Sequence, residues 1–319
     1  MTEPGLYQAA VISSGLRDLL DRQGDFDLVV HSVFKSAANL LSAKGTLVTL
    51  ASAGRDLMPM GMLVSPGLAL QEGQRLHYRE GVFHLSGAVI STRQAKIRPT
   101  SLPAPLKPNE QTLAGGLSLI KKVLTERDRG GIASLAALIP GKDGPVSSGP
   151  LNHYSSFIFH DLTAFLEALG AGDFKRAGEL ARRLVGFGPG LTPSCDDFLS
   201  GVLLSLYYDA SFGPCHPETA SFFEQIKALA RDRTSLVSRH MLNHAAAGHA
   251  GTLHLELLEA LVQGDLAKLV PLVRRLLSFG ASSGADFLLG LYCAQLQMPR
   301  QVNYPANQIN QVRDRRQAC

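Results

Sequence analysis

A segment over residues 186–197 combines glycine, hydroxyl and carboxyl groups in the short sequence GFGPGLTPSCDD. Turns of this composition at the start of a helix bind anions, because free backbone N–H groups point outward and the helix dipole favours negative charge. We therefore expect a pocket for phosphate or carboxylate here. Its expected ligands are Gly188, Gly190, Thr192 and Ser194.

A second turn, over residues 279–286, reads FGASSGAD and has a similar pattern. Its expected anion ligands are Ser282, Ser283 and Asp286. In both turns the pattern Ser-x-x-Asp, just before an apolar run, is also typical of a helix capping box, in which the serine hydroxyl accepts a hydrogen bond from the amide three residues on. Capping and anion binding are compatible, so both interpretations stay open for Ser194 and Ser283.

Two adjacent carboxyl groups close the first turn. We expect Asp196 and Asp197 to be the catalytic residues, with Asp196 orienting an amide N–H or acting as a base. Cys195 beside them lies at a helix start, a position that lowers a thiol pKa and favours a nucleophile. The second turn has Gly284 in that place, so a small residue suffices there and the nucleophile role is not favoured.

Several well-defined nucleotide-binding and metal-binding sequence motifs are absent from the chain. There is no G-K-[ST] and no G-x-G-x-x-G between a strand and a helix, which excludes a P-loop and a dinucleotide fingerprint. His240 and His244 have a spacing that can bind metal, but no glutamate follows as in H-E-x-x-H, and glycines interrupt the helix pattern. We expect neither a metal nor a cofactor.

Hydroxyl groups also mark the segment after residue 233. Thr234, Ser238 and Leu242 share one helical face, and hydroxyls on the buried side of a helix need partners. They either bond to carbonyls of the preceding turn or line the same anion pocket. In the second case we expect Arg239 to act as a bidentate clamp on a carboxylate or phosphate.

Composition narrows the class of protein. The 319 residues contain 31 Lys plus Arg and 27 Asp plus Glu, a net charge of +4 that is too weak to indicate a nucleic-acid binder. No run of 18 apolar residues occurs, so no membrane-spanning helix is expected. The N-terminus lacks a signal-peptide pattern and the four cysteines form no C-x-x-C pair, which favours the cytoplasm.

The elements that must position these residues fall into an α+β fold. Short runs rich in Val, Ile and Phe, separated by glycine, predict a β-rich domain over residues 1–105, as a sheet or small barrel, with one helix over 6–22 before the strands. Apolar residues then recur every three or four positions and predict a larger helical domain over 106–298. The polar residues 299–319 predict a mobile tail.

The helical half contains an internal repeat. LEAL, GD, RRL and FG within residues 166–188 recur in the same order at 258–280, at an offset of 92. The second copy is then shorter by three residues, so that the pattern of 194–201 recurs at 283–290. This predicts one unit of helix, helix, glycine-rich turn and helix used twice. Two such units usually bury their apolar faces against each other, which would place the two turns in comparable positions.

The motif GxGLTPSxDDFLxG over residues 188–201 resembles the signature of a bacterial family, AllH, identified as a subunit of the oxamate carbamoyltransferase of allantoin breakdown. Residues 282–290, 234–248 and 32–34 are similar to that family too, so the resemblance extends over about residues 25–295. The family usually has glycine where this chain has Cys195. A thiol there is expected to narrow the anion pocket.

The resemblance implies a multi-subunit transferase of purine catabolism that interconverts oxalurate plus phosphate with carbamoyl phosphate plus oxamate. These are all small anions, in agreement with the glycine-rich turn. The implied partners are a small anionic substrate and the other subunits, without nucleic acid or membrane. We favour a catalytic subunit that supplies donors to the phosphate and carbonyl oxygens. Two alternatives stay open: a non-catalytic assembly subunit, and another anion-binding enzyme of purine-ureide metabolism.

Overall fold

The computed structural model describes residues 5–108, 110–139 and 151–298 and divides the chain into two compact units. The first unit contains residues up to Leu102 together with His249–Leu255, and the second contains Pro103–Gly248 and residues from Glu256 onward. The first is rich in strands and the second is helical, so the predicted α+β class is confirmed. The predicted mobile tail, 299–319, lies outside the described residues.

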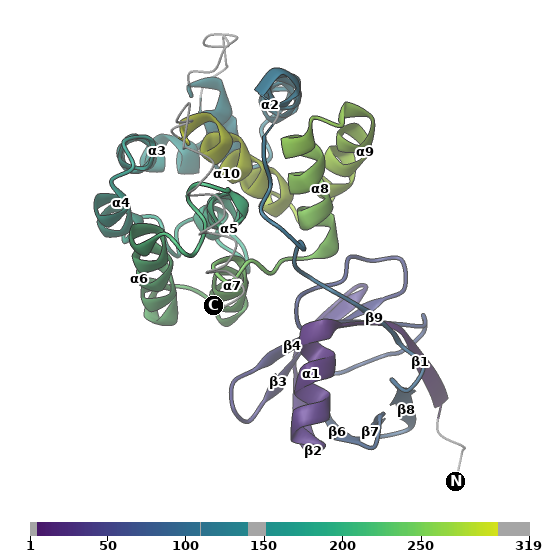
Figure 1. The fold of residues 1–319 in the computed structure, drawn as a ribbon. Helices are drawn as coiled ribbons and strands as arrows, with labels where there is room; N and C mark the ends of the chain where they lie inside the picture. The colour runs from purple at the N-terminus through teal and green to yellow at the C-terminus, as the bar shows by residue number, and fades with distance from the viewer. Residues whose placement is uncertain (1–4, 109, 140–150, 299–319) are drawn as a thin grey trace. The chain divides into compact units, whose positions relative to one another are not determined.

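The first unit is a β-barrel (Figure 1). Its strands run in the order β5-β4-β3-β2-β6-β7-β8-β1, and an antiparallel pairing of β1 with β5 closes the ring, while β9 adds to β1 outside it. The strands are β1 (Gly5–Ser13), β2 (Asp25–Phe34), β3 (Ala37–Ser42), β4 (Leu47–Ser52), β5 (Gly61–Val64), β6 (Arg75–Arg79), β7 (Val82–Leu85), β8 (Ala88–Ser91) and β9 (Lys96–Arg98).

Alternating apolar residues explain why these strands form a barrel. Leu28 and Val30 of β2, like Leu76 and Tyr78 of β6, are two positions apart and both are buried, because successive strand residues point to opposite faces. Closing the sheet on itself buries these inward side chains in one core and leaves no long edge between β1 and β5.

One prediction was wrong at the N-terminus. The sequence predicted a single helix over residues 6–22, but residues 5–13 form strand β1 and only Ser14–Gln23 forms a helix, α1. Ser13 caps α1 by accepting a hydrogen bond from the Leu16 amide. Tertiary pairing with β5 and β8 decides the strand, because its backbone groups are satisfied by neighbours more than 40 residues away in sequence.

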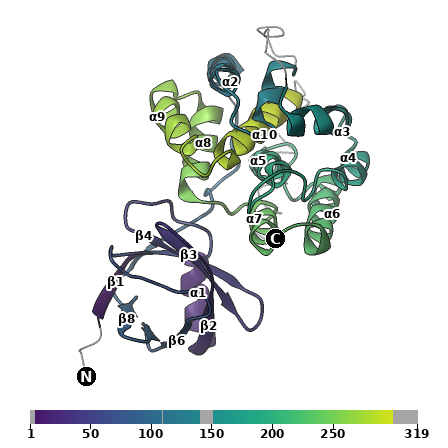
Figure 2. The same cartoon turned by 180° about the vertical axis from the view of Figure 1, so that it is seen from behind.

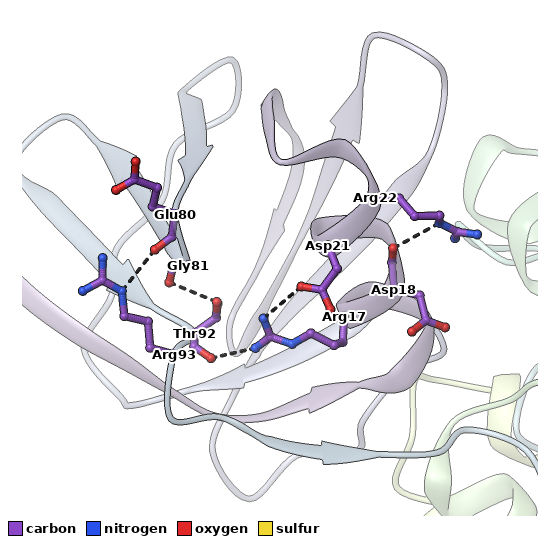
Figure 3. Close-up of polar contacts among 8 residues, drawn as sticks. All are labelled: Arg17, Asp18, Asp21, Arg22, Glu80, Gly81, Thr92 and Arg93. Atoms are coloured by element: carbon purple, nitrogen blue, oxygen red, sulfur yellow. Dashed lines mark hydrogen bonds and ion pairs between the residues drawn. The ribbon is translucent and has the colours of Figure 1, made fainter.

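Polar contacts join α1 to the β6–β7 hairpin (Figure 3). Glu80 and Gly81 both have positive φ, as a two-residue type I′ turn requires. The Thr92 hydroxyl donates to the Gly81 carbonyl at 3.0 Å, and the Arg17 guanidinium of α1 donates to the Thr92 carbonyl at 2.8 Å. With Leu16 buried in the barrel core, this chain of contacts fixes α1 against the strands.

The second unit consists of helices around a central pair. They are α2 (Glu110–Thr125), η1 (Ala133–Ala137), α3 (His153–Gly170), α4 (Phe174–Ala181), α5 (Ser194–Tyr208), α6 (Pro217–Arg233), α7 (Leu236–Ala245), α8 (Thr252–Gln263), α9 (Leu266–Leu276) and α10 (Ser283–Gln297). Figures 1 and 2 show α5 and α10 at the centre, with α3, α4 and α6 on one side and α2, α8 and α9 on the other. Helices α5 and α10 are buried on nearly all faces, as expected for helices that are apolar all round.

Two glycines let the central helices cross in backbone contact. A Cβ at Gly201 of α5 would lie 2.5 Å from the Phe287 carbonyl oxygen, and a Cβ at Gly290 of α10 would overlap the Phe198 carbonyl oxygen. The relation is reciprocal, because each glycine meets the backbone around the phenylalanine three residues before the other. This crossing sets how close the N-terminal ends of α5 and α10 come to each other.

A second buried contact fixes His249–Leu255 within the first unit. Asp56, between β4 and β5, accepts hydrogen bonds from the Leu253 amide at 2.8 Å and from the Thr252 hydroxyl at 2.6 Å. Its other oxygen lies 3.4 Å from His254 Nδ1. Burial works to raise the pKa of Asp56, but the contacts with His254, Thr252 and Leu253 outweigh it and hold that pKa below its ordinary value. Asp56 therefore caps α8 from a distant part of the chain.

We expect Gly290→Ala to lower the free energy of unfolding by about 3 kcal/mol, since its Cβ would press on backbone rather than on a flexible side chain. Gly115→Ala in α2 is the matched control, because its Cβ would meet only Leu266 at 3.6 Å and should add up to about 1 kcal/mol through helix propensity. Urea denaturation measures both. Equal effects from the two variants would contradict the close crossing.

We expect Asp56→Ala to lower the free energy of unfolding by about 1–3 kcal/mol near neutral pH, because the buried Leu253 amide and Thr252 hydroxyl lose their acceptor. A lowered pKa means that this stabilisation is present above the unfolded-state pKa and disappears as pH falls through the folded-state pKa. The difference from wild type, measured by denaturation at several pH values, should therefore shrink below about pH 4. A constant difference would contradict the role of the charge.

Candidate functional site

The two glycine-rich turns meet at the N-terminal ends of the central helices. We call residues 186–194, up to the first residue of α5, the first turn, and residues 279–283, up to the first residue of α10, the second turn. The Thr192 hydroxyl lies 2.9 Å from the Ser283 hydroxyl and joins them. Asp196, Asp197 and Asp286 are all buried beside this contact, and we call them the carboxyl cluster. The sequence predicted these residues as site residues, and the fold brings them together.

The capping-box interpretation was wrong. Helix α5 begins after Pro193 and α10 begins after Ser282, and neither cap makes a side-chain hydrogen bond to its helix. Ser194 and Ser283 are instead the first helical residues, so their hydroxyls do not cap the amides three residues on. The carboxyls of Asp196, Asp197 and Asp286 instead accept hydrogen bonds from the Gly186 amide, the Thr192 hydroxyl and the Ile132 amide, respectively. The serine and carboxyl groups are thus left to interact with each other.

Asp196 holds the first turn in its shape. One carboxyl oxygen accepts a hydrogen bond from the Gly186 amide at 2.8 Å, and the other accepts one from the Thr234 hydroxyl, with Ser238 close by. Burial raises the pKa of Asp196, although these three contacts act to lower it. Of the two roles open for Thr234, bonding to a preceding carbonyl is therefore excluded. Its hydroxyl faces the carboxyl cluster.

Asp197 and the two turns form a closed set of hydrogen bonds. The Thr192 hydroxyl donates to Asp197 at 3.1 Å, and the Ser283 hydroxyl also interacts with this carboxyl. Burial, and next the nearby charge of Asp286, raise the pKa of Asp197 well above its ordinary value. A carboxyl from α5 is thus satisfied by one hydroxyl from each turn.

Asp286 of α10 is the fully buried member of the cluster. Its Oδ1 accepts a hydrogen bond from the Ile132 amide at 2.8 Å. Its Oδ2 has no hydrogen-bond partner among the described residues, and neither does the fully buried Oγ of Ser194. Burial raises the pKa of Asp286 to about 6, although the Ser194 hydroxyl, the Ile132 amide, the Ser282 hydroxyl and the Ala133 amide all act to lower it.

The segment before η1 approaches Asp286 through a glycine. A Cβ at Gly131 would overlap the Asp286 carboxyl, so a larger residue there would force this buried side chain to move. Asn152, the N-cap of α3, holds this segment by donating to the Gly131 carbonyl at 2.9 Å and to Asp128 at 2.8 Å. Sequence analysis missed these residues. The Gly-Gly pair at 130–131 marks a turn, but no local signal says that it contacts a carboxyl more than 150 residues later.

None of the ion pairs formed by the described residues involves the carboxyl cluster. This is why burial dominates the pKa shifts of all three groups, which favours their protonated forms. Perturbed carboxyl groups of this kind gather at functional sites, because a neutral carboxyl can donate a hydrogen bond and a buried carboxylate binds a donor strongly. The cluster therefore has the chemistry of a binding or acid–base site.

Several backbone amides of the first turn have no acceptor among the described residues. In the described structure, the amides of Gly188, Gly190, Leu191, Thr192 and Ser194 make no hydrogen bond within the chain. Gly188 and Gly190 have positive φ, and Gly188 lies over the start of α5, where a Cβ would be 2.6 Å from the Ser194 nitrogen. The first turn thus presents successive N–H donors at a helix N-terminus.

Two other residues were considered from the sequence, Arg239 as an anion clamp and Cys195 as a disfavoured nucleophile. Arg239 donates to the Arg231 carbonyl at 3.4 Å, and no hydrogen bond or ion pair of the described residues joins it to the carboxyl cluster. Its role as an anion clamp stays a prediction. Cys195 is fully buried, and burial raises the pKa of its thiol well above the ordinary value, which disfavours a thiolate nucleophile. At Gly284, the matching position, a Cβ would overlap the Leu276 carbonyl.

Ser235 ties the first turn to α7. Its hydroxyl donates to the Leu191 carbonyl at 2.7 Å and accepts from the Ser238 amide at 3.1 Å as the N-cap of the helix. Sequence analysis placed Thr234 and Ser238 on one face and overlooked Ser235 between them. A serine before a helical pattern is a capping signal that should have marked it.

No group of three or more His, Cys, Asp or Glu side chains among the described residues has an arrangement that would hold a metal ion. None of the described helices has both the length and the apolar character needed to cross a membrane.

We expect Asp286→Asn to be more stable than wild type by about 1–3 kcal/mol near pH 7.5, because the amide mimics the neutral carboxyl. The folded-state pKa is raised, so the folded protein binds more protons than the unfolded one, and wild-type stability should fall as pH rises from about 4 to about 6. The variant should flatten this slope in urea denaturation, although Asp196 and Asp197 keep part of it. A variant less stable than wild type near pH 7.5, with an unchanged slope, would contradict the assignment.

Two family models match the chain. The model of the oxamate carbamoyltransferase subunit AllH matches residues 184–295, which include both turns and the carboxyl cluster. The model of the AllH family N-terminal domain matches residues 8–97, which make up most of the barrel. No solved structure matches the chain significantly. Since the two matches together cover more than half of the sequence, the chain belongs to the AllH family of oxamate carbamoyltransferase subunits.

Proposed function

We propose that this chain works as a subunit of an oxamate carbamoyltransferase and binds a small anionic substrate at the first turn. The family supports the subunit role and the existence of partner subunits. The free amides of Gly188, Gly190, Leu191, Thr192 and Ser194 are the observation that supports the binding site, because N–H donors at a helix start match phosphate and carboxylate oxygens.

Buried carboxyl groups beside a site for a negatively charged ligand raise the question of electrostatic repulsion. Three carboxylates would repel a phosphate, but burial raises the pKa of each group in the carboxyl cluster. The raised pKa values favour the protonated forms, which carry no charge and can donate hydrogen bonds to an anion. A substrate that brings negative charge into the cluster would raise these pKa values further, so proton uptake should accompany binding.

The contacts of each carboxyl suggest different roles. Asp196 uses its oxygens on the Gly186 amide and the Thr234 hydroxyl, so it acts on the substrate through the shape of the first turn. Thr192 and Ser283 stand between the two turns and satisfy Asp197. Donors of this sort stabilise charge on the phosphate and carbonyl oxygens during carbamoyl transfer without a covalent nucleophile.

We further propose that the two turns derive from one duplicated unit. Helices α3, α4 and α5 have the same order as α8, α9 and α10, each set with a turn before its last helix. The Ser283 hydroxyl interacts with Asp197, and Ser194 lies near Asp286, so each turn's serine faces the other turn's aspartate. This crosswise arrangement supports a single site shared by both turns rather than two separate ones.

We expect Gly188→Ala to weaken binding of carbamoyl phosphate at least about tenfold, since its Cβ would press on the Ser194 amide and cover the donors. Calorimetric titration of the full chain measures this, with inorganic phosphate for comparison. Wild type should bind carbamoyl phosphate saturably and more tightly than phosphate.

The matched control is Gly172→Ala, between α3 and α4. Gly172 also has positive φ, so its replacement carries similar backbone strain, but no atom lies within 4 Å of its Cβ. This variant should lose stability and keep its affinity. If wild type binds neither ligand, or if both variants lose affinity equally, the first turn is not the binding site.

A further inference from the structure

Aromatic side chains gather where α3 meets the first turn. Phe187 of that turn stacks on Phe157 of α3, with ring centroids 5.3 Å apart and ring planes 10° apart. Phe187 also makes an edge-on contact with Tyr154, with 6.4 Å between the ring centroids. Phe157 is 69% exposed and Tyr154 is 38% exposed. We call these three residues the aromatic patch, and much of its apolar surface is left in contact with water.

The second copy of the sequence repeat has no such helix start. Helix α3 has 18 residues, whereas α8, the helix at the matching place, has 12. At the repeat offset of 92 residues, Tyr154 and Phe157 correspond to Ala246 and His249, which both come before the start of α8 at Thr252. The repeated helix therefore forms without these positions, and the exposed rings need a reason other than the formation of a helix.

The residues around the aromatic patch have the composition of a protein–protein interface. Residues 153–160 of α3 contain no Asp, Glu, Lys or Arg. At the edge of the patch, Arg183 pairs at 2.8 Å with Asp161, one helical turn beyond Phe157, and its side chain is 69% exposed. The neighbouring Arg182 is exposed and forms no ion pair among the described residues. An uncharged aromatic centre with arginine at its rim is typical of an interface.

The charges at the rim select the kind of partner. Two copies of this chain joined by a two-fold contact would bring the same arginines to both sides, and like charges across an interface disfavour binding. A different polypeptide with an apolar centre and acidic residues around it matches both the rings and the arginines. The family supports the existence of such a polypeptide, because its members are subunits of a larger enzyme.

We propose that the aromatic patch is the surface on which this chain binds another subunit of the transferase, with Phe157 as the central anchor and with Arg182 and Arg183 facing acidic residues of that subunit. This inference rests on the subunit role in the proposed function. Phe187 lies between two glycines of the first turn, so a subunit seated on the patch would also border the free amides of that turn. It would then shield this side of the anion site from water.

Biolayer interferometry of the full chain against the purified remaining subunits of the same transferase tests the proposal. Phe157→Ser removes a mostly exposed ring and should weaken binding about 30-fold or more, as for an anchor residue of an interface. Arg182→Gln should slow association and lessen its dependence on salt, because charges at a rim act mainly on the encounter of the two proteins.

Phe159→Ser is the matched control. Phe159 is another exposed phenylalanine of α3, at 36%, but it lies about 200° round the helix from Phe157. Its replacement should leave the affinity for the other subunits at the wild-type value. Thermal melting of every variant checks that it is folded. If Phe157→Ser does not fold, Tyr154→Ser takes its place.

The outcomes separate this surface from the proposed function. Wild-type affinity in folded Phe157→Ser, or equal weakening by Phe157→Ser and Phe159→Ser, overturns the surface and leaves the subunit role intact. A wild-type chain that binds none of the other subunits overturns both. Self-association of the chain alone that Phe157→Ser abolishes, measured by sedimentation, overturns a different polypeptide as the partner. The carbamoyl phosphate titration tests the anion site separately, since it needs no partner.

Discussion

The backbone contact between α5 and α10 is the constraint on which the rest of the helical unit depends. Gly201 and Gly290 allow two buried helices to touch main chain to main chain, so the helix starts, seven residues before each glycine, are brought together. Each helix start carries a turn, a serine and an aspartate. The carboxyl cluster therefore exists only because two small residues lie at one crossing point, and larger residues there would separate its halves.

Burial then gives this cluster its chemistry. Carboxyl groups removed from water, without a cation partner in the described structure, resist ionisation and hold protons at higher pH than usual. Such groups reduce stability near neutral pH, so their presence indicates a use that packing alone would not require. The two halves of the cluster are not equivalent, because Asp197 interacts with the hydroxyls of Thr192 and Ser283, whereas Asp286 accepts a hydrogen bond from the distant Ile132 amide.

The sequence predicted much of this. The α+β class and the AllH family are confirmed, and the predicted residues Thr192, Asp197 and Ser283 do meet. The capping-box prediction was wrong because it considered only local hydrogen bonds. The aspartates also bond to groups far along the chain, such as the Ile132 amide for Asp286. The prediction of one helix over residues 6–22 was wrong for the same reason, since the pairing of β1 with β5 and β8 outweighs a local helical pattern.

What the sequence determined by itself is therefore the chemical content of the site and the periodicity of its helices. Residue types, glycine spacing and the 3.6-residue repeat are local properties that can be read without coordinates. Only the tertiary structure decided which buried oxygens are satisfied and which are not. That depends on contacts such as Gly131 against Asp286, which join residues more than 150 positions apart and leave no mark on either local pattern.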